Sequence, residues 1–136
     1  MPDAKRKNYR FLGWYYKNGS KSVLAKDSME IKKSIVLIAK WQKIKVKTIS
    51  NFKKTKVLIK GQKAFKISWS KVKNASCYQY RSAWKKSGLK KAKVYTKYDA
   101  YVNYPRGDYY IEVRAGEKDS TGKMIYGKWK KYHVTK

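Results

Sequence analysis

Apolar and polar residues alternate with a period of two along most of this chain. Phe65, Ile67 and Trp69 fall on one face of a segment whose other face carries Lys66 and Ser68. Such alternation predicts strands with one buried face and one hydrated face. It predicts them over residues 9–16, 35–41, 43–49, 56–60, 65–69, 78–81, 93–95, 100–102, 109–115, 123–126 and 129–134.

Turn signals separate the expected strands, and no helical period competes with them. Residues 17–20 (Lys-Asn-Gly-Ser) predict a turn, whereas residues 21–34 are polar and mixed, without a clean helical period. Strands that recur about every ten to twelve residues with short turns are typical of a β-sandwich or barrel. The pattern therefore predicts an all-β fold without a long helix.

The charge of the chain is strongly positive and comes mainly from lysine. Of 136 residues, 36 are Lys or Arg and 8 are Asp or Glu, which gives a formal net charge of +28. Lysine is a flexible, hydrated point charge, whereas specific recognition of phosphates and bases favours the planar fork of arginine. The lysine excess therefore indicates diffuse attraction to polyanions or a solvated surface. The arginines are Arg6, Arg10, Arg81, Arg106 and Arg114.

The composition argues against several classes of protein. Aromatic residues make up 15% of the chain, far more than disordered basic tails contain. The longest apolar run, residues 35–39, is much too short to span a membrane, so we expect no membrane insertion. No apolar stretch follows residues 1–7, so we expect any export signal to lie outside this chain. Cys77 is the only cysteine, which excludes an internal disulfide and a cysteine-based zinc site.

Residues 47–136 resemble a fibronectin type III domain of the lysine-rich kind found in bacterial surface and secreted proteins. Residues 65–72 (Phe-Lys-Ile-Ser-Trp-Ser-Lys-Val) resemble strand B of that family. Residues 73–80 resemble the entry into strand C, with Cys77 where glycine is usual. The resemblance implies a β-sandwich in which Trp69 fills the centre of the core.

The C-terminal part of the chain carries the rest of this resemblance. Residues 105–115 resemble the E–F corner and strand F, with one residue fewer than usual between Gly107 and Tyr109. Residues 126–129 (Tyr-Gly-Lys-Trp) resemble the start of strand G, followed by Lys130 in place of the usual serine. The resemblance implies a tyrosine corner, in which the Tyr109 ring is buried while its hydroxyl bonds to the backbone.

A second resemblance covers residues 2–41. Residues 9–15 (Tyr-Arg-Phe-Leu-Gly-Trp-Tyr) and 37–41 (Leu-Ile-Ala-Lys-Trp) look like the closing half of an internalin B-type (Listeria–Bacteroides) repeat, whose fold is small and β-grasp-like. The first hairpin of that repeat is absent. We therefore expect a partial repeat segment over residues 1–45 and a fibronectin type III-like domain over residues 46–136. Because a module of about forty residues without disulfide or metal is marginal, we expect the segment to belong to a longer protein or to pack on the sandwich.

Catalytic and metal-binding chemistry is poorly represented. His133, the only histidine, has no sequence neighbour suited to a catalytic triad, and Cys77 has no evident base. The many cations favour the charged form of the carboxylates, whereas a general acid needs a carboxyl group with a raised pKa. Glu117 and Asp119 resemble a calcium loop only loosely, because their spacing fits no EF-hand. The sequence therefore predicts no enzyme, no cofactor and no metal site.

Candidates for partner binding remain among loop and aromatic residues. Arg106, Gly107 and Asp108 spell the tripeptide that integrins read, here expected before strand F, whereas the integrin-binding fibronectin domain presents it in the F–G loop. The glycine also suits a tight turn, so the tripeptide has an ordinary structural explanation. The other candidates are aromatic residues that could serve as platforms for carbohydrate or protein: Trp84, Tyr98 and Tyr101.

The function favoured by these observations is a non-catalytic, extracellular spacer or adhesion module of a bacterial surface or secreted protein. The expected partners are proteins, anionic cell-wall polymers such as teichoic acids, or host glycans, attracted by the positive field. We expect a monomeric module within a longer chain. The alternative is an intracellular nucleic-acid-binding protein that uses the same lysines and aromatics. An accessory domain of an enzyme is a further alternative.

Overall fold

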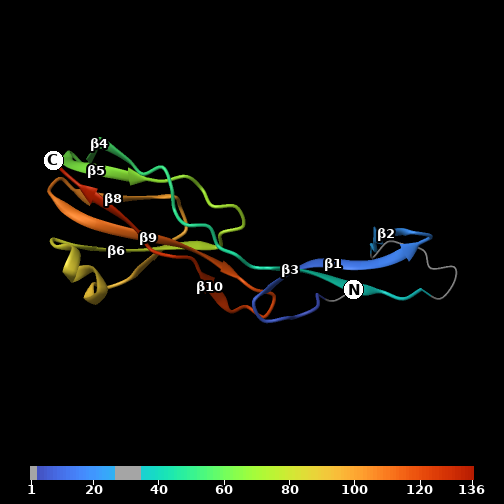
Figure 1. Ribbon diagram of the computed structural model, residues 1–136. Coiled ribbons are helices and arrows are strands. Elements are labelled where there is room, and N and C mark those ends of the chain that lie inside the picture. Colours follow the sequence, from blue (N-terminus) through green and yellow to red (C-terminus); the bar gives the residue numbers. More distant parts are fainter. Residues whose placement is uncertain (1–2, 27–34) are drawn as a thin grey trace. The chain divides into compact units, whose positions relative to one another are not determined.

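The computed structural model describes residues 3–26 and 35–136, and its regular elements are almost all antiparallel strands (Figure 1). The predicted all-β class is thereby confirmed. The strands are β1 (Tyr9–Asn18), β2 (Lys21–Leu24), β3 (Ile38–Lys43), β4 (Lys53–Ile59), β5 (Gln62–Ser68), β6 (Cys77–Ala83), β7 (Tyr95–Lys97), β8 (Tyr101–Pro105), β9 (Tyr109–Lys118), β10 (Met124–Tyr126) and β11 (Lys130–Val134), with a short 3-10 helix η1 (Lys86–Lys91) after β6.

The predicted strand over residues 43–49 is wrong, because residues 44–50 belong to no strand. Ile44, which alternates with lysines, is nevertheless buried, and so is Ile49, which falls outside that alternation. The backbone of this segment bonds to scattered partners, and the N–H of Ile44 donates to the Asn8 carbonyl over 3.1 Å. An alternating pattern predicts that one side of a segment is buried, but it does not show that a neighbouring strand is available to pair with that segment.

Strand β2 was not predicted, since residues 21–34 show no regular pattern. In the structure Lys21 pairs with Asn18 across a two-residue turn, and β2 continues antiparallel to β1. Gly19 has a φ of +68° in this turn, a conformation that glycine adopts at little cost. The two-residue turn therefore places residues 21–24 beside β1, where backbone pairing makes them a strand. Residues 27–34 lie outside the described residues.

The chain divides into two compact units that each use two separate segments. Unit 1 comprises residues 1–44 and 118–125, and unit 2 comprises residues 45–117 and 126–136. The change from one unit to the other at residues 44 and 45 adjoins the predicted domain boundary. The return of residues 118–125 to unit 1 was not predicted.

Unit 1 contains a three-stranded sheet in the order β2-β1-β3. Its register shifts between Phe11 and Gly13, which leaves Leu12 as a bulge. Gly13 has a φ of +127°, and a Cβ at this position would lie 2.7 Å from Leu24 Cδ1. The glycine noted within this strand is therefore required by both the backbone conformation and the close approach of β2.

The second segment of unit 1 is joined to the first by hydrogen bonds. The Asn8 N–H donates to Asp119 Oδ2 over 2.7 Å, and the Arg6 N–H donates to Ser120 Oγ over 2.7 Å. The Ser120 hydroxyl donates in turn to the Arg6 carbonyl over 2.8 Å, and the Ser120 N–H donates to the Tyr9 carbonyl over 3.0 Å. The N-terminal segment thus depends on the turn after β9 for partners of its backbone.

Unit 2 is built from two antiparallel sheets over a shared core. One has the order β4-β5-β8 and the other contains β9-β6-β7, with β11 also paired to β9. Inward-facing side chains from both sheets meet in one apolar cluster. Its buried members are Ile49, Phe65, Ile67, Trp69, Tyr78, Val102, Tyr109, Ile111, Val113, Ala115 and Val134.

The core of unit 2 includes the two aromatic residues that the sequence analysis singled out. Trp69 is 5% exposed and packs edge-on against Phe52 and Tyr78, with ring centroids 6.2 and 5.4 Å away. Tyr109 is buried, and its hydroxyl donates to the Pro105 carbonyl over 2.8 Å. A tyrosine whose hydroxyl bonds to backbone four residues upstream therefore closes the turn between β8 and β9. Across residues 3–26 and 35–136, no helix has the length and apolar character needed to cross a membrane.

Candidate functional site

The tripeptide at residues 106–108 lies in the turn between β8 and β9, and both of its charged groups have partners within the chain. The guanidinium of the arginine donates to the carbonyls of Ala64 and Val57, over 3.2 and 3.3 Å. The carboxylate of the aspartate accepts the backbone N–H of Lys136 over 2.8 Å. These bonds attach the arginine to β4 and β5 and the aspartate to the end of the chain.

Trp84 lies close to this turn. Its side chain is 79% exposed, and its ring packs edge-on against Tyr109 at a centroid distance of 6.2 Å. A Cβ on Gly107, which is itself buried, would lie 4.0 Å from the Trp84 ring. Trp84 and Arg106 both line a hollow of about 240 Å³, which we call the Trp84 cavity. The structure thus brings Trp84 and the tripeptide together.

Tyr98 and Tyr101 form a separate group at the turn between β7 and β8. Both line a hollow of about 530 Å³, which we call the Tyr98 cavity. Tyr98 is 78% exposed, whereas Tyr101 is half-buried. Tyr101 pairs with Ser68 across β5 and β8, and Pro105 pairs with Ala64. Along these strands the two groups are therefore about 13 Å apart.

Charged groups surround the ring of Tyr101. The Nζ atoms of Lys66 and Lys97 lie 4.7 and 4.8 Å from its centroid, within the range of cation–π attraction. Lys97 Nζ is also 4.0 Å from Asp99 Oδ2, and Asp99 and Lys66 line the Tyr98 cavity. The cavity therefore combines aromatic, cationic and acidic side chains.

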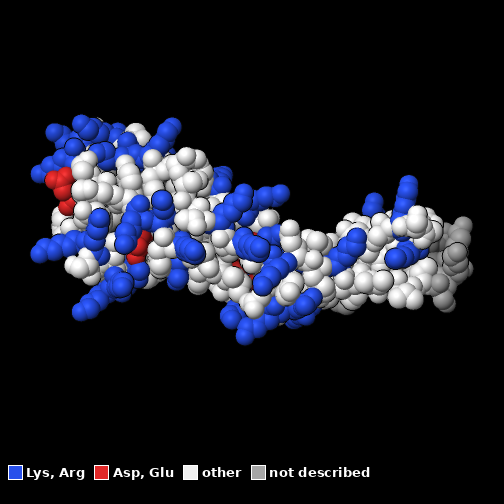
Figure 2. All heavy atoms as spheres, in the orientation of Figure 1, with Lys and Arg blue, Asp and Glu red and all other residues white. Residues whose placement is uncertain are grey.

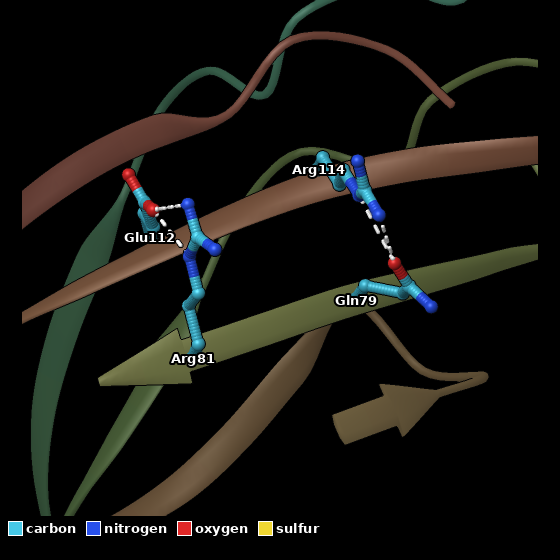
Figure 3. A network of polar contacts seen from close by, with 4 residues as sticks. All are labelled: Gln79, Arg81, Glu112 and Arg114. Atoms are coloured by element: carbon cyan, nitrogen blue, oxygen red, sulfur yellow. Dashed lines mark hydrogen bonds and ion pairs between the residues drawn. The ribbon is translucent and has the colours of Figure 1, made fainter. Parts of the chain in front are cut away.

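Sequence reasoning missed a polar network on the outer face of β6 and β9 (Figure 3). Arg81 pairs with Glu112 and Gln79 with Arg114, as the register of the two strands requires. The guanidiniums of both arginines lie over the indole of Trp129, at 4.2 and 4.5 Å from its centroid. The alternation within each strand placed these residues on outer faces, but the pairing depends on a register that the sequence does not show.

This network changes the interpretation of the arginines, because each of the five has an intramolecular partner. Arg81, Arg106 and Arg114 are engaged as described above. In unit 1, the Arg6 guanidinium stacks 3.8 Å from the Tyr9 ring centroid, and Arg10 donates to the side chain of Gln42. The side chains best suited to bidentate recognition of phosphate are therefore already used within the fold.

The acidic residues are partly withdrawn from the surface. Glu112, Glu117 and Asp119 are 3%, 6% and 5% exposed. Hydrogen bonds hold the pKa of Asp119 down to about 2; the largest contribution is from the Asn8 N–H, followed by the Thr121 hydroxyl. Figure 2 accordingly shows blue Lys and Arg side chains over much of the visible surface and few red acidic groups.

The histidine and the cysteine do not form a catalytic pair. Cys77 pairs with Gly116 of β9, whereas His133 pairs with Tyr110 of the same strand. The length of β9 between these partners, about 20 Å, separates the two side chains. His133 stacks on Tyr110 with a centroid distance of 4.3 Å, and Cys77 is buried.

The turn that loosely resembled a calcium loop has its carboxylate occupied by the chain itself. Asp119 Oδ1 accepts from the N–H groups of Thr121 and Lys123 and from the Thr121 hydroxyl, and Oδ2 accepts from Asn8. Among the described residues, no group of three or more His, Cys, Asp or Glu side chains could hold a metal ion. The carboxylate of Asp119 is therefore a structural acceptor.

Comparison with known proteins gave no match: no family model fits the chain, and no curated protein or solved structure is significantly similar to it.

Proposed function

We propose that this chain is a non-catalytic spacer and adhesion module of a bacterial surface or secreted protein, and that its lysine-covered surface associates with anionic polymers. The candidate polymers are teichoic acids of the cell wall and acidic host glycans. Within this proposal, residues 46–136 are a fibronectin type III-like domain, and the N-terminal segment is a partial internalin B-type repeat.

The observation that carries the proposal is the difference in surroundings between arginines, acidic residues and lysines. All five arginines contact the chain itself, and Glu112, Glu117 and Asp119 are buried. Most of the cations that face water are lysines, with Arg6 also exposed, and lysines attract polyanions without selecting a sequence of bases. This difference favours a diffuse polyanion-binding surface over a nucleic-acid-reading one.

The topology of unit 2 supports the family assignment. A three-stranded sheet β4-β5-β8 and a second sheet centred on β6 and β9 are what an immunoglobulin-like sandwich would contain, which supports the proposal. The hydroxyl of Tyr109, bonded to Pro105, supports a tyrosine corner despite the short loop. Lysines on the edge strand β4, at residues 53, 54 and 56, discourage pairing with other strands, as a solitary spacer requires.

A binding titration over a salt series tests the proposal. The full chain is titrated with wall teichoic acid, a heparin fragment and single-stranded RNA, at ionic strengths from about 0.05 to about 0.3 M. We expect the two surface polymers to bind at about 0.15 M salt and to weaken as salt rises. Tighter binding of RNA than of either polymer would favour the nucleic-acid alternative. Absence of all binding at about 0.15 M salt would overturn the adhesion role.

A further inference from the structure

The Tyr98 cavity has features that a diffuse lysine coat does not require. It is a hollow of about 530 Å³, within the range of ligand-binding pockets. Tyr98 presents an aromatic ring that is 78% exposed, although burial of such a ring against the core would be favourable. The buried side chains of Trp69 and Tyr78 form part of the lining, so the hollow rests on the rigid core of unit 2.

The charges at this cavity are unbalanced over a short distance. Lys66 and Lys97 both hold an ammonium group within 5 Å of the Tyr101 ring centroid, at 4.7 and 4.8 Å. Asp99 is the acidic residue of the cavity lining, and it lies 4.0 Å from the ammonium of Lys97. Its side chain is 64% exposed and can accept further hydrogen bonds. Lys66 and Lys71 line the cavity and Lys97 lies beside it, so three lysines accompany the one carboxylate.

These groups are complementary to a ligand that carries hydroxyls together with an acidic group. A carboxylate or sulfate would neutralise the second ammonium, and ligand hydroxyls would donate to Asp99. The apolar face of a sugar ring would cover the exposed ring of Tyr98. A nucleic-acid strand fits less well, because its dense phosphates would repel the Asp99 carboxylate.

We propose that the Tyr98 cavity binds one acidic saccharide unit, with its ring on Tyr98, its acidic group at Lys66 and Lys97, and a hydroxyl on Asp99. This inference rests on the proposed function, since it assigns a discrete site within the polyanion-binding surface. It names acidic glycan, instead of polymeric phosphate, as the ligand that the site selects.

Charge-matched variants test this site. Lys66→Gln/Lys97→Gln removes the two cations over the Tyr101 ring, of which Lys66 lines the cavity. Lys56→Gln/Lys63→Gln removes two exposed lysines of β4 and β5 that do not line the cavity. Tyr98→Ala removes the platform, and Trp84→Ala removes a similarly exposed ring, 79% exposed, from the other cavity. Dissociation constants at about 0.15 M salt are measured for hyaluronan and heparin hexasaccharides, neutral maltohexaose and an oligothymidylate.

We expect Tyr98→Ala and Lys66→Gln/Lys97→Gln each to weaken saccharide binding about tenfold, as the loss of one stacking or charge-assisted contact would. The matched controls should weaken it less than about threefold. Preference for hyaluronan would indicate a carboxylate ligand, and preference for heparin a sulfated one; either supports the site. Maltohexaose should not bind measurably.

Three results would overturn the inference, each in a distinguishable way. Equal losses in both lysine pairs, with no effect of Tyr98→Ala, would show diffuse binding and leave the proposed function intact. Dependence on Tyr98 for oligothymidylate alone would assign the cavity to nucleic acid. Failure of the unmodified chain to bind either acidic saccharide would show that the cavity is not a saccharide site. The titration with teichoic acid would then test the proposed function separately.

Discussion

At the scale of single residues, the chain uses arginine and lysine for different purposes. Arg81 lies between the Glu112 carboxylate and the Trp129 indole, with side-chain exposures of 15% for the arginine and 4% for the glutamate. Lysine could not replace it without loss, because one ammonium cannot both stack as a plane and present a fork of donors. Arg81 and Arg114 are therefore used where a cation is partly buried, whereas most of the described lysines face water.

Removing Arg81 leaves the buried carboxylate of Glu112 without its cation. We expect Arg81→Met to lower the free energy of unfolding by about 3 kcal/mol, and Arg81→Met/Glu112→Leu to recover most of that loss. Urea unfolding followed by circular dichroism measures both variants, with Lys63→Met as the control for losing a cation at an exposed position. Equal stability of Arg81→Met and the control would show that the pair is dispensable.

Tyr109 links stability to alkaline pH. Desolvation by burial, with a smaller effect of Tyr104, raises its pKa from 10.0 to about 12. The folded pKa lies above the unfolded one, so the stabilisation is fully present below pH 10 and is lost as the pH rises through about 12. We expect stability to fall across this window, and Tyr109→Phe to flatten the fall while costing about 1 kcal/mol at neutral pH through the lost bond to Pro105.

Unfolding free energies at several alkaline pH values provide the measurement for this residue. Tyr126→Phe is the matched control, because Tyr126 is partly exposed, at 38%. If Tyr109→Phe and Tyr126→Phe show the same pH profile, the buried corner tyrosine does not cause the alkaline loss.

At the scale of elements, the turn after β9 connects parts of the sequence that alternation treats as unrelated. Asp119 accepts the N–H of Asn8, and its other oxygen organises the turn through Thr121 and Lys123. Strand patterns predict which residues are buried, but they do not predict that residues 118–125 complete a unit begun by residues 1–44. This explains why a segment too short for a core of its own can fold.

Asp119→Asn should weaken unit 1 selectively, because the amide would present a donor where two oxygens now accept. The pKa of Asp119 is lowered to about 2, mainly by the Asn8 N–H, so its stabilising contribution is present above the unfolded pKa of 3.8 and is lost as the pH falls through about 2. We expect hydrogen exchange in β1 to rise in the variant at pH 5, while exchange in β6 and β9 is unchanged. Uniform acceleration in all three strands would contradict this.

Much of the fold followed from period-two alternation because most strands of unit 2, notably β5, β8 and β9, place apolar side chains in its core. Phe65, Ile67 and Trp69 are all buried, as predicted. The failures occurred where pairing decides the structure: residues 44–50 are buried in part but have no partner strand, and residues 21–24 gain one through a hairpin. Register and partner choice depend on contacts distant in the sequence.

The candidate sites could be predicted only as separate residues. The sequence leaves open whether Trp84, Tyr98 and Tyr101 are exposed. In the structure Trp84 and Tyr98 are 79% and 78% exposed, whereas Tyr101 is half-buried. Their assignment to two different cavities depends on the β5–β8 register, which sets the spacing between Tyr101 and Pro105. Lys66 carried no special signal among the other lysines, and its place in the cavity lining beside the Tyr101 ring depends on the pairing of β5 with β8.

At the scale of the whole molecule, the net charge of +28 is expected to lower the free energy of unfolding. Like charges repel in the compact state, and few exposed carboxylates offset them here. Added salt should therefore stabilise this chain, although it would weaken a fold maintained by surface ion pairs. The same screening should weaken polyanion binding, so stability and binding are expected to respond to salt in opposite directions.

We therefore expect the melting temperature to rise by several degrees as sodium chloride increases from about 0.01 to about 0.15 M, over which the screening length falls from about 30 to about 8 Å. The gain should be smaller in Lys56→Gln/Lys63→Gln, which carries two fewer charges, because repulsion is what the salt relieves. Differential scanning calorimetry of both proteins measures it. A flat or falling profile would show that repulsion among the lysines does not limit stability, and that the coat is sufficiently hydrated to be energetically neutral.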